Sequence, residues 1–477
     1  MRRTQTISLG RIVIFSAVII LSIGSLALAQ AEQAAPAAPP TSAAPVIPPK
    51  VTLPPLPEVN LPPLAPGVPT LVPTDRPLTL NEAIALALQH QPDLSLAGAG
   101  VVSAAGRTKQ AASGLLPAIN ASAQYSKSGP ASEISTPLGG STTTNTNSYS
   151  TSISGQQLLF DFGRTSAEVS QARRQEESAR QSLAQTREDV INQVKQAYYT
   201  LLQNQQLVEV QRRNVADQQA HLDLTRARFQ AGVAPRADVV RAETSVATAI
   251  LSLATAENNA ATALVNLNLA MGVEVRTPTQ VEETTEPPPA LPPLEQIVEQ
   301  ALGNRSAVKQ SRADLAAAQE GLRVARTGNL PALVAVGNIG WRDTTFPPST
   351  ESWSYGASLQ FPLYNGGATS GQIRAAQGNL QAAQARLRQT EQAVGAEVTQ
   401  AYLSVQTAAQ QVTAAEAEVA NAEESLRLAT GRYQAGVAAF IEVIDGETAL
   451  LTARTNRVNV VYGLSMARAA LQRALGQ

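Results

Sequence analysis

Few residues in this chain could carry out covalent, metal or acid–base chemistry. Its 477 residues include no cysteine and only two histidines, His90 and His221. The lack of cysteine excludes a disulfide scaffold, thiolate zinc sites, iron–sulfur ligation and a cysteine nucleophile. The histidines lie far apart in sequence, and we expect surface or packing roles for them rather than metal ligation. No catalytic triad, carboxylate pair or phosphate-binding loop occurs in a supporting context, which argues against an enzyme and predicts no cofactor.

Acidic residues at two helix starts are the remaining candidates for chemistry. Glu442 and Asp445 are three residues apart just after Gly436, which places both carboxylates on one helix face. One interpretation is that these carboxylates favour the passage of cations. The other is that they complement the helix dipole, which is the main role expected of Asp238 after Pro235.

The composition favours a thin, extended protein. The 36 basic and 37 acidic residues give a net charge of −1, which argues against a nucleic-acid binder. Only 4% of the residues are aromatic and 15% are charged, so a large core of bulky side chains is not expected.

The first 77 residues read as targeting and spacer segments. Residues 1–29 contain three arginines, an apolar run and an Ala-Leu-Ala site, which predicts a secretory signal; the alternative is an N-terminal membrane anchor. Residues 30–77 hold fifteen of the 30 prolines and are expected to form an extended spacer rather than a motif for a proline-reading domain. No later run is apolar enough for a membrane helix, so we expect an exported protein without one.

The rest of the chain is a duplication. The sequence R-F-Q-A-G-V at 228–233 recurs as R-Y-Q-A-G-V at 432–437, an offset of 204, whereas Leu-Pro at 116–117 recurs at 330–331, an offset of 214. The difference falls between Pro117 and Phe160, which predicts a tolerant polar loop there. Another Pro-rich break then divides the chain into residues 78–275, a linker 276–293, and residues 294–477.

Long helices dominate each copy. Apolar residues recur every seven positions from Val194 to Phe229 and again from Val398 to Tyr433, which predicts coiled-coil seams. The two longest helices are expected at Arg164–Gln230 and Ala368–Gln434, each about 100 Å long. Shorter antiparallel partners are expected at Thr79–Leu116 (kinked or broken at Pro92), Arg236–Gly272, Leu294–Leu330 and Phe440–Leu475.

Each copy has two segments with alternating apolar residues between its first two helices, which makes four such segments in all. Each is about 9–11 residues long, which suits a strand crossing an outer membrane. Tyr125, Tyr149, Trp341 and Trp353 lie near the loops that join these strands, as an interfacial aromatic girdle requires. The alternative is a soluble hairpin with one buried face. Four strands cannot close a barrel, so closure would need more than one chain.

These features together resemble the TolC-type outer-membrane efflux proteins. The resemblance covers both copies and includes the Leu-Pro steps, the strand-to-helix turns at 159–163 and 362–367, and the Arg-aromatic-x-x-Gly tips. It implies a mostly α, α+β homotrimer in which coiled-coil helices form an α-barrel below a 12-strand barrel in outer-membrane lipid. It also implies docking to a periplasmic adaptor and an inner-membrane pump or ABC transporter.

The resemblance also assigns roles to individual residues. Glu442 and Asp445 match positions whose carboxylates narrow the periplasmic entrance, and we include Asp238 in this candidate gate. Ala438 stands where many members carry a basic residue that locks the closed tip. Arg236 is the candidate replacement, and the alternative is a tip that is held more loosely. The candidate adaptor contacts lie in the tips at Arg228, Gly232, Arg432 and Gly436.

Two other classes of protein remain alternatives on the sequence alone. One is a periplasmic coiled-coil adaptor, although duplication of the whole helix–hairpin–helix unit argues against it. The other is a structural envelope fibre, which would not need hairpins of membrane length. The cargo, whether drug, metal ion or secreted protein, is not encoded in a recognisable motif.

Overall fold

The computed structural model describes residues 76–129, 134–135, 141–142, 146–283 and 292–477. The predicted signal segment 1–29 lies outside this part of the chain, as do all but the last two residues of the predicted spacer 30–77. Within the polar segment between Pro117 and Phe160, a short pair of strands is described, β2 (Ile134–Ser135) and β3 (Ser141–Thr142). The sequence predicts only a loop there.

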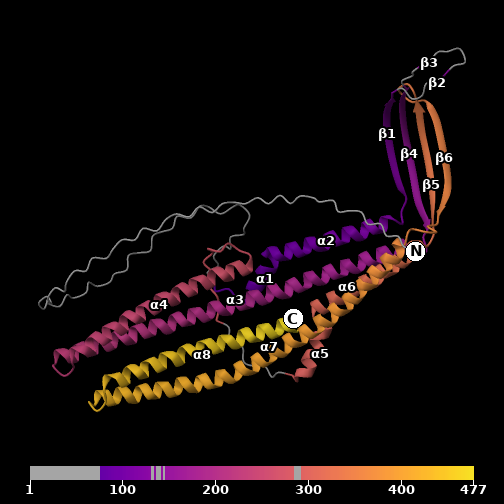
Figure 1. Cartoon of the computed structure of the whole chain (residues 1–477). Coiled ribbons are helices and arrows are strands. Elements are labelled where there is room, and N and C mark those ends of the chain that lie inside the picture. Colours follow the sequence, from indigo (N-terminus) through magenta and orange to yellow (C-terminus); the bar gives the residue numbers. More distant parts are fainter. Residues whose placement is uncertain (1–75, 130–133, 136–140, 143–145, 284–291) are drawn as a thin grey trace, which may run out of the picture. The chain divides into compact units, whose positions relative to one another are not determined.

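Two 67-residue helices are the longest elements (Figure 1). The helices α3 (Arg164–Gln230) and α7 (Ala368–Gln434) have the predicted bounds at both ends. The remaining α-helices of the described residues are α1 (Leu80–His90), α2 (Pro92–Ser113), α4 (Arg236–Met271), α5 (Leu294–Asn304), α6 (Ser306–Arg326) and α8 (Phe440–Ala474). A short 3-10 helix at Thr327–Asn329 directly follows α6.

Turns with left-handed backbone set the ends of α3 and α7. Both helices begin directly after a glycine with a φ near +85°, Gly163 or Gly367. The residue before that glycine is also left-handed, with a φ of 57° at Phe162 and 65° at Gly366. A left-handed Phe is disfavoured because its Cβ crowds the backbone, so the first copy holds a strained residue where the second has glycine.

The helices pair as two antiparallel hairpins, α3 with α4 and α7 with α8 (Figure 1). Two large apolar clusters lie where the shorter helices meet the long ones. One surrounds Val194, Tyr198 and Leu267 of the first copy, and the other surrounds Val398 and Val405 of the second. The buried positions follow the predicted seven-residue seam, and in the second copy alanines at 408, 415 and 422 form its small layer.

The predicted helix Leu294–Leu330 is wrong in one respect, because it is broken at Arg305. The first copy breaks at the equivalent residue, Gln91, where Pro92 follows and makes the break predictable. No proline follows Arg305, yet its backbone is extended, with a φ of −59° and a ψ of 125°. The sequence therefore lacked the local signal for this break.

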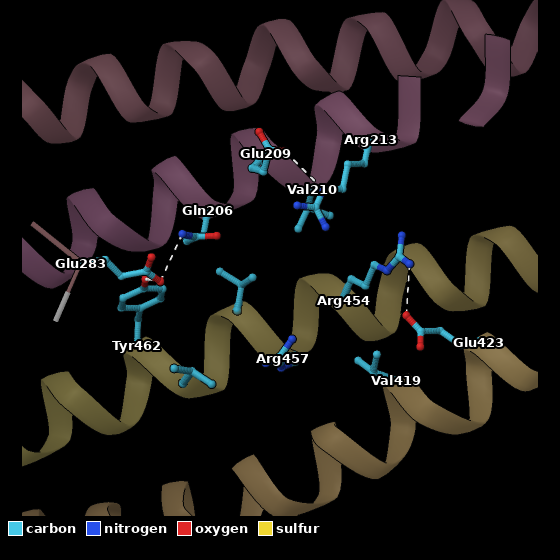
Figure 2. A pocket seen from close by; sticks show the side chains of 12 residues that line it. Gln206, Glu209, Val210, Arg213, Glu283, Val419, Glu423, Arg454, Arg457 and Tyr462 are labelled. Carbon is cyan, nitrogen blue, oxygen red and sulfur yellow. Dashed lines mark hydrogen bonds and ion pairs between the residues drawn. The ribbon is translucent and has the colours of Figure 1, made fainter. Parts of the chain in front are cut away.

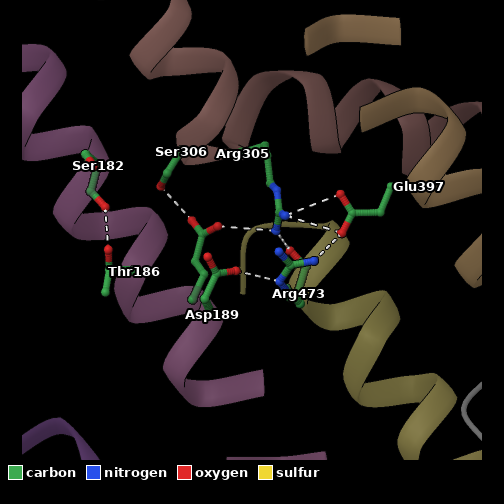
Figure 3. A network of polar contacts seen from close by, with 8 residues as sticks. Ser182, Thr186, Asp189, Arg305, Ser306, Glu397 and Arg473 are labelled. Atoms are coloured by element: carbon green, nitrogen blue, oxygen red, sulfur yellow. Dashed lines mark hydrogen bonds and ion pairs between the residues drawn. The ribbon is translucent and has the colours of Figure 1, made fainter. Parts of the chain in front are cut away.

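Tertiary contacts explain the second break (Figure 3). The Arg305 guanidinium is 3% exposed and pairs with Glu188 of α3 and Glu397 of α7, both at 3.3 Å, and donates to the carbonyl of Arg473. The Ser306 hydroxyl donates to Glu188 at 2.6 Å, and Arg473 pairs with Glu397. An extended residue at 305 is what allows one guanidinium to reach three helices.

We expect Arg305→Met to destabilise the fold strongly. Removing one partner of a buried pair leaves Glu188 with an uncompensated charge, which costs about 3–5 kcal/mol. Arg312→Met is the matched control, because Arg312 pairs with Glu391 at the surface and its loss should cost under about 1 kcal/mol. Unfolding followed by circular dichroism measures both, and equal losses would contradict the assigned role.

The four predicted strands are confirmed and form one antiparallel sheet in the order β1-β4-β5-β6 (Figure 1). Their bounds are Ala118–Ser128, Thr146–Phe160, Ala332–Asp343 and Thr350–Gln360. Register is continuous across the sheet apart from one irregularity between Leu158 and Phe160. The outer edges of β1 and β6 have no strand partner within the described residues.

The two faces of the sheet differ in chemistry. Residues paired across the strands share a face, so the register sorts the side chains. One face is mainly apolar and consists largely of Ile119, Ala121, Ala123, Tyr125, Ile153, Leu333, Ala335, Ile339, Trp341, Trp353, Tyr355, Ala357 and Leu359. The other is mainly polar, apart from Ala118, Leu158, Ala332, Val334 and Val336 near the helices, and includes Asn120, Ser122, Gln124, Ser150, Ser152, Ser154, Asn338, Arg342, Ser352, Ser354 and Ser358. Nearly all residues of β1 and β6 are exposed, so neither face has a covering layer within the described chain.

One helix departs from the expectation about membrane helices. By length and composition alone α4 could cross a membrane, with a mean hydropathy of 1.2 over its most apolar window. In the structure α4 packs against α3 through Ala242, Val246 and Ala249. Its apolar character therefore serves the coiled coil on at least one face.

Candidate functional site: the helical tips and the sheet

The two tips have nearly the same backbone. Gly232 and Gly436 are left-handed, with φ values of 73° and 74°. In each turn the amide after the glycine, Val233 or Val437, donates to the carbonyl of the preceding arginine at 3.0 Å. This pattern ends a helix with a glycine and leaves both valines about 70% exposed. The predicted tip residues therefore lie in two matching turns. The exposed valine of each turn, Val233 or Val437, forms what we call its tip crown.

Arginines hold the tips in place. The guanidinium of Arg228 lies 4.3 Å from the ring centre of Tyr433, which joins the tip of the first copy to that of the second. Arg432 pairs with Glu442 at 3.0 Å across its own turn. Arg236, the predicted replacement for a basic residue at Ala438, is exposed and forms no ion pair within the described chain. Arg228 is thus the residue that bridges the tips. Its contact with Tyr433 joins residues 205 positions apart, and no local sequence motif signals it.

The three acidic candidates have different environments. Asp238 lies in the first turn of α4, and Glu442 in the first turn of α8. Asp445 lies beyond the first turn, where the helix dipole has little effect; it is exposed and forms no ion pair among the described residues. Among the three, the dipole explanation is therefore weakest for Asp445.

The two histidines lie on different helices. His90 lies in the last turn of α1, whereas His221 lies on α3 and contacts Glu447 of α8. The described residues contain no group of three His, Asp or Glu side chains close enough to hold a metal. The pairing of His221 with Glu447 was not predicted, because it depends on how the two hairpins dock.

The four candidate girdle residues all lie on the apolar face of the sheet, towards the end farther from the helices. Tyr125 is paired with Tyr149 in the register, with ring centres 4.9 Å apart. Trp353 is 67% exposed and stacks on Tyr355 at 5.8 Å. Trp341 is half-buried on the neighbouring strand, two register positions from Trp353.

A cavity of about 420 Å³ lies between α3 and α8, midway along the hairpins (Figure 2). Its charged lining is balanced: Arg213 pairs with Glu209 at 3.3 Å, and Arg454 pairs with Glu423 at 3.1 Å. At one end, the Tyr462 hydroxyl donates to Glu283 at 3.4 Å, and burial together with this carboxylate raises the pKa of the tyrosine. This lining does not select a ligand of one charge.

Comparison with known proteins agrees with these features. The outer membrane efflux protein family matches the chain twice, over residues 83–273 and 297–477. Protein CyaE of Bordetella pertussis is 30% identical over 85% of this chain and 86% of its own length. Outer membrane protein TolC of Escherichia coli is 24% identical over 81% of this chain and 79% of its own.

Solved structures show the same fold. The outer membrane channel CmeC of Campylobacter jejuni superposes with a TM-score of 0.75 at 19% identity, covering 83% of this chain and 85% of that channel. The family match removes the adaptor and the envelope fibre as alternatives. The chain belongs to the outer membrane efflux protein family, the TolC-type export channels of the outer membrane.

Proposed function

We propose that three copies of this chain form an export channel-tunnel that catalyses no reaction. Cargo, either small toxic molecules or secreted proteins, would enter from an inner-membrane pump or ABC transporter joined by a periplasmic adaptor. The sheet is the observation that carries the proposal, since it combines one apolar face, one polar face and two open edges. The proposed segments are the signal 1–29, the spacer 30–77, repeats 78–275 and 294–477, and the linker 276–293.

The open edges support assembly of identical copies. In hydrocarbon an unpaired backbone amide or carbonyl costs several kcal/mol, so β1 and β6 need partners. Pairing β6 of one copy with β1 of the next satisfies both edges. Three copies supply twelve strands, enough for a barrel with an aqueous lumen, whereas two supply only eight, whose interior side chains fill.

The faces of the sheet support its placement in lipid. The apolar face with Tyr125, Tyr149, Trp341 and Trp353 would contact lipid, and the aromatic rings would form a girdle near the outer interface. The serine-rich face would line the lumen. Apart from Arg342 near the end of β5, the side chains of this face are uncharged, so most of the charge selection would occur elsewhere.

We propose that this selection occurs at the tips. In a trimer Glu442 and Asp445 would supply six carboxylates around one axis, which would favour cations. Arg432 neutralises part of the charge of Glu442, so Asp445 carries the larger free charge. Asp238 lies at the equivalent start of α4. It would contribute less to the selection of cations, because its main role is to complement the helix dipole.

The assembly and channel activity can be tested directly. We expect the purified protein to migrate as a heat-sensitive trimer and to conduct ions in planar bilayers. A deletion strain assayed in parallel for drug sensitivity and for missing secreted proteins would identify the cargo class. A soluble monomer without conductance would contradict the proposal.

Neutralising Asp445 should alter ion selectivity more than neutralising Glu442. A unit charge about 8 Å from a permeating ion contributes about 2 kcal/mol at an effective dielectric constant near 20, and screening by salt lowers this value. We therefore expect Asp445→Asn to lower the cation-over-anion permeability ratio several-fold, and Glu442→Gln to lower it less. Reversal potentials in a salt gradient measure both. Unchanged selectivity in the double variant would exclude the gate role.

Charge placed on the tip crowns should block export without blocking the pore. Val233→Asp and Val437→Asp would put a carboxylate into a docked adaptor interface, at a cost of several kcal/mol, which lowers export more than about tenfold. Trimers and conductance should be retained. Thr345→Asp, in the exposed turn between β5 and β6, is the control with normal export. Full export by the tip variants would argue against docking there.

A further inference from the structure

Towards the tips, each helical hairpin has its own apolar core. Leu222, Ala242 and Val246 form the buried cluster of the first hairpin, and the second has a separate one made of Ala422, Leu450 and Ala453. Within the described residues no buried apolar cluster joins the hairpins in this region. The cavity in Figure 2 lies next to this region, on the side away from the tips. At the far end of the cavity, Tyr462 of α8 still belongs to the apolar core of the first copy. Near the tips, contacts of charged and polar side chains join the hairpins.

Glu447 of α8 makes the most buried of these contacts. Its side chain is 8% exposed and pairs with Nε2 of His221 on α3. Its second oxygen accepts a hydrogen bond from Nε2 of Gln218, also on α3, at 2.9 Å. The carboxylate is thus held by two side chains of the opposite hairpin, one turn apart. The tip contact between Arg228 and Tyr433 is the next link outward.

The charges around His221 favour its protonated form. The hydrogen bond to Glu447 raises its pKa; burial opposes this, and the charges of Glu447 and Asp217 add to the rise. From α8, Arg454 lines the same small cavity, with its guanidinium paired to Glu423 of α7. From α4, the residues lining the adjoining cavity are Thr244, Ser245 and Thr248 together with other uncharged side chains, and the nearby Glu243 pairs with Arg226.

We propose that Glu447, held between His221 and Gln218, is a latch that joins the two hairpins of a protomer and keeps the periplasmic entrance narrow, and that deprotonation of His221 weakens it. The latch is a positioning device and touches no cargo. It rests on the entrance function proposed above. Because Glu447 lies five residues beyond Glu442 on the same helix, separating α8 from α3 would also move the gate carboxylates.

The direction of the pH effect follows from the raised pKa of His221. The latch is fully formed below the pKa that this histidine has when the hairpins are apart, which is about 6.5. The latch is lost as the pH rises through the higher pKa that His221 has when the hairpins are joined. Between these two values, the ratio of separated to joined hairpins should rise by at most about tenfold per pH unit for each latch.

Spin labels can measure the separation of the hairpins, because the chain contains no cysteine. Ala220→Cys on α3 and Ala449→Cys on α8 are exposed sites for labels. The double-labelled chain, diluted with unlabelled chain, would be measured by pulsed electron resonance from about pH 5 to about pH 9. We expect short, narrow distances at low pH and longer, broader distances at high pH.

Two variants and one control decide the matter. His221→Gln and Glu447→Gln can keep a neutral hydrogen bond but should abolish the pH dependence of the distance. His90→Gln, which changes the other histidine, should retain it. A pH-independent wild type, or an unchanged pH response in His221→Gln, would overturn the latch. Conductance measured in parallel separates the two proposals: a chain without conductance contradicts the channel, whereas a conducting chain with a pH-independent distance contradicts only the latch.

Discussion

The need to pair every backbone polar group within the membrane governs the rest of this structure. A four-stranded sheet with two open edges cannot lie in hydrocarbon alone, because both edges would expose unpaired amides and carbonyls. Its uncovered apolar face is equally unsuited to a separate soluble domain. The sheet therefore becomes stable only as part of a closed ring, and the helices must follow the same ring.

A wall that is shared among copies explains the composition. The hairpins α3–α4 and α7–α8 bury seams of valine and alanine, and their cores near the tips consist of a few residues each. A wall one coiled coil thick needs no bulky centre, which accounts for an aromatic content of 4%. Tyr198, among the largest fully buried side chains of the described residues, lies where α1, α3 and α4 meet. Its hydroxyl donates to the carbonyls of Leu78 and Glu282, on two segments that are joined by a short parallel β-bridge.

The sequence predicted elements that depend on local chemistry and missed those that depend on docking. Glycine turns and seven-residue seams gave the bounds of α3 and α7, and Pro92 signalled the break between α1 and α2. The break at Arg305 has no local signal, because a buried guanidinium bound by three distant helices causes it. Likewise, Arg228 with Tyr433 and His221 with Glu447 are 205 and 226 positions apart, so only the packing of the hairpins brings them together.

The duplicated copies differ where the hairpins meet. The acid occurs twice, but Glu243 pairs with Arg226 inside its own hairpin, whereas Glu447 reaches His221 of the other. The residue equivalent to His221 in the second copy is Ser425, which cannot carry charge. Within the described chain α8 packs on α3, while α4 has no comparable contact with α7. In the proposed trimer, α4 would therefore meet α7 of the next copy, and seams with a titratable pair would alternate with seams without one. A change in pH would then act on three of six seams, so opening would begin within each protomer rather than between protomers.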